Sequence, residues 1–145
     1  MIYLIKTRRF GDNRGWFTES YSERRFAEHG VSTRFVQDNH SLSRTKGTLR
    51  GLHFQSPPFA QAKLVRCLRG RILDVFVDLR RGSPTFGHHG SVELSGDSDE
   101  QVLVPEGYAH GFLTLEPDTE IMYKVSNFRS EEHTSELQSR LHLVC

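Results

Sequence analysis

Glycine residues divide most of this chain into short apolar runs, and this feature most restricts its fold. The runs are rich in Val, Leu, Ile and Phe, and each is too short for an ordinary helix. Many short strands at even spacing are typical of an all-β sandwich or barrel. The dividing residues are Gly47, Gly51, Gly70, Gly82, Gly87, Gly90, Gly96, Gly107 and Gly111.

The clearest strand pair is Lys63–Leu68 followed by Arg71–Leu79, joined across Arg69-Gly70. Side chains alternate along a strand. One face of the second strand therefore carries Leu73, Val75, Val77 and Leu79, and the other carries Ile72, Asp74, Phe76 and Asp78. Further strands are predicted at Phe35–Asp38, Leu49–Gln55, Ser91–Leu94, Gln101–Val104, Gly111–Leu115 and Glu120–Val125.

One short N-terminal helix is predicted at Glu23–His29. Ser22 is a good N-cap, Glu23 suits the first turn, and Gly30 can end the helix. Phe26 is its expected buried contact.

Composition narrows the class of protein. The chain has 145 residues, enough for one domain with a core. Its apolar fraction is 36% and its mean hydropathy is -0.52, which predicts a soluble protein with no membrane partner. A net charge of +1 argues against nucleic-acid binding. The two cysteines exclude a disulfide scaffold, and no secretion signal opens the chain, so a cytoplasmic location is expected.

The segment Arg129–Cys145 differs from the rest of the chain. It reads RSEEHTSELQSRLHLVC, without periodicity or turn signals, and resembles the translation of a sequencing-library adapter. We therefore expect the domain to occupy residues 1–128, and residues 129–145 to be a non-native, poorly packed tail.

Three residues on predicted strands are candidates for acid–base chemistry. His53 lies among apolar neighbours, where burial would keep it neutral and able to accept a proton; a core histidine is the alternative. Lys63 shares a face with Val65 and Cys67, which is consistent with a site facing the interior, and a strand-edge lysine whose head reaches solvent is an equal alternative. Tyr123 is predicted to point inward, as a proton donor or as ordinary core.

His110 is expected in a loop that enters a strand, where it could bind an anion or a metal. A metal site needs three or four converging ligands, and the eight histidines supply no such spacing, so no metal is expected. Two arginines, Arg14 and Arg50, could grip a pyrophosphate, although ordinary surface positions would explain them equally. The polar residues near them that could read a base edge are Glu19, Gln37, Asp38 and Asn39.

These strings together are similar to one family. FGDNRGWFTES, FVQDNHS, LRGLHFQ, PPFAQAKLVRCLRGRILDVFVDLRRGSPTFG and LVPEGYAHGFLTL resemble the dTDP-4-dehydrorhamnose 3,5-epimerases, over about Arg9 to Asn127. The resemblance implies a cupin-like jelly-roll β-sandwich, a homodimer and an isomerase without cofactor or metal. The implied substrate is a dTDP-4-keto-6-deoxyhexose, epimerised at C3 and C5 during dTDP-L-rhamnose biosynthesis for cell-surface polysaccharide.

The resemblance also implies roles for individual residues. His53 matches the catalytic base, Lys63 the group that stabilises the enolate oxygen, and Tyr123 the acid that returns a proton on the opposite face. The matches to the family's nucleotide-sugar contacts are Arg14, Glu19, Gln37, Asp38, Asn39, Arg50, Lys63 and His110.

Two departures accompany the resemblance. Arg129 stands where the family has a tyrosine that stacks on thymine, and the Asp that pairs with the catalytic His is absent, which predicts a slow or inactive chain. Strict alternation also puts Arg50 and His53 on opposite faces, which a bulge near Gly51 would resolve. The alternatives are a related dTDP-keto-sugar epimerase or ketoisomerase, or a cupin-like module that only binds a nucleotide sugar.

Overall fold

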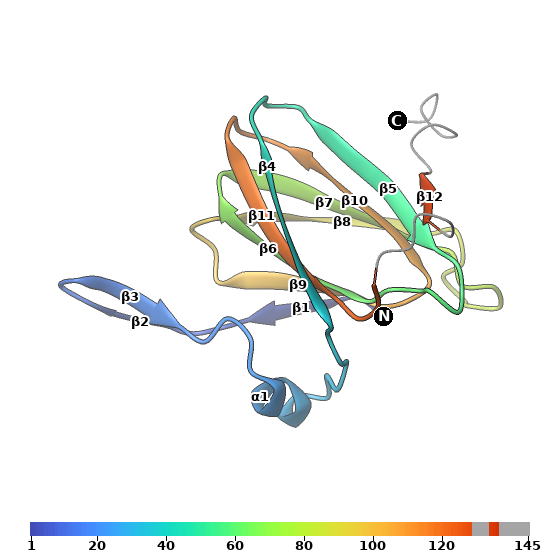
Figure 1. Cartoon of the computed structure of the whole chain (residues 1–145), viewed down its shortest axis with the longest axis horizontal. Helices are drawn as coiled ribbons and strands as arrows, with labels where there is room; N and C mark the ends of the chain where they lie inside the picture. Colours follow the sequence, from blue (N-terminus) through green and yellow to red (C-terminus); the bar gives the residue numbers. More distant parts are fainter. Residues whose placement is uncertain (129–133, 137–145) are drawn as a thin grey trace.

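Two antiparallel sheets form the body of the protein in the computed structural model, which describes residues 1–128 and 134–136 (Figure 1). The first sheet has the order β1 (Tyr3–Lys6), β9 (Glu100–Val104), β6 (Lys63–Arg69), β11 (Thr119–Val125), β4 (Gln37–Ser43). The second has the order β12 (Thr134–Glu136), β5 (Leu49–Gln55), β10 (Tyr108–Thr114), β7 (Arg71–Asp78), β8 (His89–Ser95). The all-β prediction is confirmed.

A separate hairpin precedes the helix. Its strands, β2 (Arg9–Asp12) and β3 (Gly15–Thr18), pair with each other and project from the sandwich (Figure 1). The hairpin and β1 were not predicted, because their short runs are mixed with charged residues and carry no clear alternation. Its aromatic side chains Phe10, Trp16 and Phe17 are exposed.

The predicted helix is confirmed as α1 (Glu23–Glu28), one residue shorter than expected. The Ser22 side chain accepts a hydrogen bond from the Arg25 backbone N–H at 3.3 Å, which satisfies one of the free donors of the first turn. Phe26 is buried as predicted, in a small cluster with Val31, Leu64 and Leu103.

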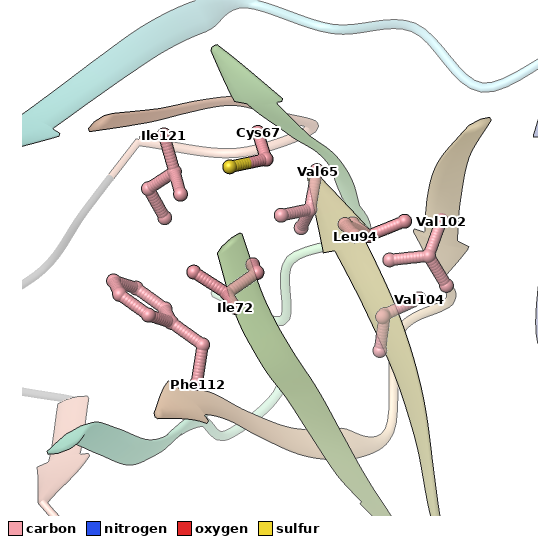
Figure 2. Close-up of a cluster of buried hydrophobic side chains, with 8 residues drawn as sticks. All are labelled: Val65, Cys67, Ile72, Leu94, Val102, Val104, Phe112 and Ile121. Atoms are coloured by element: carbon pink, nitrogen blue, oxygen red, sulfur yellow. The ribbon is translucent and has the colours of Figure 1, made fainter. Parts of the chain in front are cut away.

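The main core fills the space between the two sheets. It contains Val65, Cys67, Ile72, Leu94, Val102, Val104, Phe112 and Ile121, whose side chains converge in Figure 2. The predicted alternation therefore holds in β6 and β7, since Val65, Cys67 and Ile72 all point inward. On β7 the inward face also carries the buried carboxyls of Asp74 and Asp78.

Several predicted boundaries are displaced. β4 starts at Gln37 and extends to Ser43, whereas the apolar pair before it falls outside the strand. β10 begins at Tyr108, three residues before the predicted strand, because the segment treated as a loop pairs with β7 from Tyr108↔Asp78 onward.

Residues 134–136 belong to the segment expected to be a poorly packed tail, and their backbone is ordered. They form β12 and pair antiparallel with β5, with the register 134↔Gln55 and 136↔His53. Residues 129–133 and 137–145, which the same expectation covered, lie outside the described residues. The described part of the chain has no helix long and apolar enough to cross a membrane.

Candidate functional site

A polar pocket opens between the two sheets beside the apolar core. Its lining comes from strands of both sheets and from the turn that leads into β10. The lining residues are Asn39, His53, Phe54, Gln55, Gln61, Lys63, Gly107, Tyr108 and Tyr123. All three residues predicted for acid–base chemistry are among them.

Lys63 and Tyr123 reach the pocket from neighbouring strands of the first sheet. Lys63 precedes Val65 on the inward face of β6, and Tyr123 lies opposite Val65 on β11. The Lys63 Nζ lies 6.0 Å from the centroid of the Tyr123 ring. The inward orientation predicted for both side chains is confirmed, and the strand alternation explains it.

His53 reaches the pocket from the second sheet, and a bulge in β5 aims it there. His110 lies opposite His53 and Phe112 lies opposite Arg50, so two residues of β5 face the single residue Gly111. The strand therefore has a bulge near Gly51, the feature that would reconcile the faces of Arg50 and His53. Gly51 has a φ of +105°, and a Cβ there would lie 2.8 Å from the His110 carbonyl oxygen, so only glycine fits without strain.

The burial predicted for His53 needs correction. Its side chain is half-buried, because it faces the pocket and not the closed core. Its strand also lies near the edge of its sheet, between β10 and the short β12.

His110 lies inside β10 and not in the predicted loop. It is 5% exposed, and its Nε2 is 2.7 Å from Oδ1 of the fully buried Asp74. It is therefore closed off from solvent and does not line the pocket, although it is the direct cross-strand neighbour of His53. The two elements that hold this pair are the central strands β10 and β7.

The predicted polar residues of β4 divide between its two faces. Asn39 lines the pocket, and Gln37 beside it donates a hydrogen bond from Nε2 to the Asn39 Oδ1 at 2.7 Å. Asp38 is on the outer face, where its carboxylate accepts a hydrogen bond from the Lys124 Nζ at 2.9 Å. Strand alternation thus separates Asp38 from the pocket.

Arg50 spans the two sheets without lining the pocket. Its guanidinium donates to the Ser43 Oγ at 2.9 Å and to the Leu42 carbonyl at 3.1 Å, both on β4. Arg50 points toward β4, and His53 lines the pocket together with Asn39 of β4, so both side chains lie on the inward side of β5.

Arg14 and Glu19 also lie outside the pocket lining, on and after the projecting hairpin. Arg14 is at the tip of the projecting hairpin (Figure 1), where its guanidinium binds Asp12 at 2.7 Å. Glu19 follows the hairpin and pairs with Arg25 of α1 at 3.1 Å.

Five lining residues were missed from the sequence. Gln55 shares the alternation of His53 on β5, and Gln61 precedes Lys63 by two residues, so the period-two pattern could have found both. Gln61 is fixed by donating to the Asn127 carbonyl at 2.7 Å. Phe54, Gly107 and Tyr108 carried no comparable signal, because a strand bulge and a turn bring them in.

Within residues 1–128 and 134–136, no three His, Cys, Asp or Glu side chains gather closely enough to hold a metal ion.

Known proteins share this sequence pattern over almost the whole chain. The family model for dTDP-4-dehydrorhamnose 3,5-epimerase matches residues 1–140. The dTDP-4-dehydrorhamnose 3,5-epimerase of Sinorhizobium fredii is 54% identical over 132 residues, which cover 91% of this chain and 68% of that protein.

Two solved structures extend the comparison. One is the dTDP-4-dehydrorhamnose 3,5-epimerase of Bacillus anthracis with TDP and PPi bound, with 51% identity, a TM-score of 0.91, and coverage of 93% of this chain and 77% of that one. The other is the dTDP-6-deoxy-D-glucose-3,5-epimerase of Legionella pneumophila in complex with dTDP-4-keto-L-rhamnose, with 44% identity, a TM-score of 0.88, and coverage of 93% and 71%.

The fold and pocket place the molecule among the cupin-like β-sandwiches. Within that class, the chain belongs to the dTDP-4-dehydrorhamnose 3,5-epimerase family.

Proposed function

We propose that this protein epimerises C3 and C5 of dTDP-4-dehydro-6-deoxy-D-glucose and forms dTDP-4-dehydro-L-rhamnose. One observation carries the proposal. His53 enters the pocket from one sheet, and Lys63 and Tyr123 enter it from the other. A carbon held between the sheets would have a base on one side and an acid on the other, which is the arrangement that inversion requires.

Each inversion begins with removal of a proton from a carbon next to the C4 ketone. His53 takes that proton, and the electron pair of the C–H bond moves to the carbonyl oxygen, which becomes an enolate. Lys63 stabilises the negative oxygen with its ammonium group. This step leaves the carbon flat and open to a proton from either side.

The second half of the inversion returns a proton to the opposite side of the carbon. Tyr123 donates its phenolic proton, and the enolate reverts to the ketone. His53 then releases the abstracted proton to solvent, and the Tyr123 phenolate takes a proton from solvent, so both groups are reset. The same sequence applies at C3 and at C5. No electrons are gained or lost, and Lys63 supplies the charge for the enolate oxygen, so we expect turnover to continue in the presence of a chelator.

The position of Arg14 and Glu19 supports a homodimer. Both match nucleotide contacts of the family, yet they lie on and after a hairpin that projects from the sandwich (Figure 1), and neither lines this chain's own pocket. The hairpin also exposes Phe10, Trp16 and Phe17, and an exposed aromatic group of this kind is typical of an interaction surface. We infer that the hairpin of one subunit reaches the nucleotide bound by its partner. We further propose that the enzyme is cytoplasmic and supplies rhamnose for cell-surface polysaccharide.

The reaction is tested by NMR of the product formed from dTDP-4-dehydro-6-deoxy-D-glucose. Inverted C3 and C5 configurations support the proposal, and unchanged substrate contradicts it. Inversion at C3 alone would indicate a related keto-sugar epimerase.

The shared site is tested by mixing two variants, His53→Ala and Arg14→Ala. If Arg14 serves the partner's pocket, mixed dimers contain one complete site, and about a quarter of normal activity returns. Activity that stays at the level of the separate variants would contradict the shared arrangement.

A further inference from the structure

Tyr108 forms part of the pocket wall and is held from behind by Arg80. Arg80 Nη2 donates a hydrogen bond to the Tyr108 Oη at 3.0 Å, and the guanidinium carbon lies 4.9 Å from the centre of the Tyr108 ring. Phe76 packs edge to face against the Tyr108 ring from another side, with 6.4 Å between the two ring centroids. Arg80 itself is not among the lining residues of the pocket.

Arg80 is in turn fixed by a buried carboxylate. Asp78, whose side chain is 1% exposed, accepts hydrogen bonds from the Arg80 Nε at 3.0 Å and from its Nη2 at 2.9 Å. Two parallel bonds of this kind fix the plane of a guanidinium as well as its position. The Arg80 pair is the main reason that the pKa of Asp78 lies well below its usual range, so the carboxylate is ionised near neutral pH.

The turn before Tyr108 also rests on Arg80. Gly107, which lines the pocket, has a φ of +91°, and a Cβ built on it would overlap the Arg80 Cγ. The Gly107 carbonyl accepts a hydrogen bond from the Leu79 N–H at 2.9 Å. The side chain of Arg80 therefore supports both the backbone and the aromatic ring of this part of the wall.

We propose that Arg80 is a positioning residue for the pocket, and that it fixes the wall formed by Gly107 and Tyr108 against which the substrate is held. The inference rests on the proposed function for its kinetic consequence. A wall that shifts by about 1 Å can misalign a bound substrate and slow a reaction by up to about 100-fold. Arg80 acts through Tyr108 and Gly107 without touching the reacting atoms.

The variant Arg80→Met keeps most of the aliphatic stem and removes the fork of donors. We expect kcat/KM to fall by about ten- to a hundred-fold, with a smaller loss in Arg80→Lys, which keeps the charge but has no planar fork. Arg81→Met is the matched control, because Arg81 is an exposed neighbour outside this network, and its kcat/KM should match the unmodified protein.

A second control separates positioning from stability. Thr85 also donates a hydrogen bond to Asp78, whereas the Tyr108 hydroxyl is bound by Arg80. Thr85→Val should lower the melting temperature and leave kcat/KM unchanged well below it. If Thr85→Val and Arg80→Met lose kcat/KM in proportion to their melting temperatures, Arg80 has a structural role only and the proposal is overturned.

The coupling through Tyr108 is measured by a double-mutant cycle with Tyr108→Phe. If Arg80 acts in part through the phenol oxygen, Arg80→Met costs less in the Tyr108→Phe background than in the unmodified one. Full additivity would overturn this route.

A readout independent of activity is hydrogen exchange of the Leu79 amide. Arg80→Met should accelerate it, and Arg81→Met should not. If the unmodified protein fails to epimerise, the proposed function falls, while the exchange result still decides whether Arg80 holds the Gly107 turn. Unchanged exchange in Arg80→Met would overturn the positioning role.

Discussion

The pocket and the apolar core occupy the same space between the sheets, yet the same strands furnish them with opposite chemistry. On β6, Lys63 enters the pocket, and Val65, two residues later, is fully buried in the core. On β11, Tyr123 enters the pocket and Ile121, two residues earlier, is 1% exposed. All four side chains point inward, so alternation alone does not distinguish a site residue from a core residue.

This difference shows how the sandwich combines stability and chemistry. A charged or hydroxyl group is costly to bury unless it has a partner. Polar side chains inside the sandwich therefore either pair with each other, as His110 does with Asp74, or lie where the interior opens as a pocket. Apolar neighbours on the same strands hold those side chains in place. Substitutions at adjacent inward positions should therefore affect activity in one case and stability in the other.

The largest expected effect is on turnover in His53→Ala. Loss of a general base typically costs about 100- to 10,000-fold in rate. Because His53 is only half-buried, we expect the substitution to change the stability of the fold little. The steady-state rate and dTDP binding by calorimetry check this, with His40→Ala as the control, because His40 lies on the outer face of β4 near Glu120. Equal losses of rate and dTDP affinity would assign His53 to binding or folding.

The next effect is on completed inversion in Tyr123→Phe. The ring still fills its place beside Ile121 and Val125, and only the phenolic proton is lost. We expect net epimerisation to fall by about 100-fold or more, with carbon–proton exchange continuing and the melting temperature nearly unchanged. A normal rate of epimerisation would show that another group is the acid.

Ile121→Ala should reverse this pattern on the same strand. Removing a fully buried Ile side chain typically costs about 2–5 kcal/mol of unfolding free energy, and Ile121 does not line the pocket. Urea unfolding measures the loss, and kcat measured well below the melting temperature should stay near normal. A stable variant with low kcat would contradict the division between pocket and core.

The smallest effect concerns pH and Cys67 in the core. Burial raises the pKa of the Cys67 thiol from its ordinary 9.0 to about 11. The folded state thus favours the protonated thiol, so this contribution to stability is complete below about pH 9 and is lost as the pH rises toward about 11. Melting temperatures across this range should fall less steeply in Cys67→Ala; identical slopes would contradict the assignment.

The sequence predicted the parts of the fold and site that depend on local alternation. It predicted that Tyr123 points inward and favoured the same for Lys63, because strand alternation depends on a few neighbouring residues. It also indicated where a bulge would be needed, at Gly51, without establishing one. It did not predict the strand position of His110 or its buried pair with Asp74, because that contact joins residues far apart in the chain. The Arg80 support of Tyr108 was missed for the same reason.

The pairing of residues 134–136 with β5 was also not predicted from the sequence. Residues 134–136 have no apolar alternation, yet their backbone pairs with β5 beside His53. Backbone pairing along a sheet edge needs no particular side chains, so sequence pattern could not reveal it.

Deuterium exchange at the substrate carbons tests the central claim most directly. The protein and dTDP-4-dehydro-6-deoxy-D-glucose are incubated in heavy water, and deuterium at C3 and C5 is measured by NMR. The account predicts deuterium at both carbons with the unmodified protein, and its loss in His53→Ala but not in His40→Ala. Binding of the nucleotide sugar without deuterium at either carbon would contradict the account and make the protein a binding module.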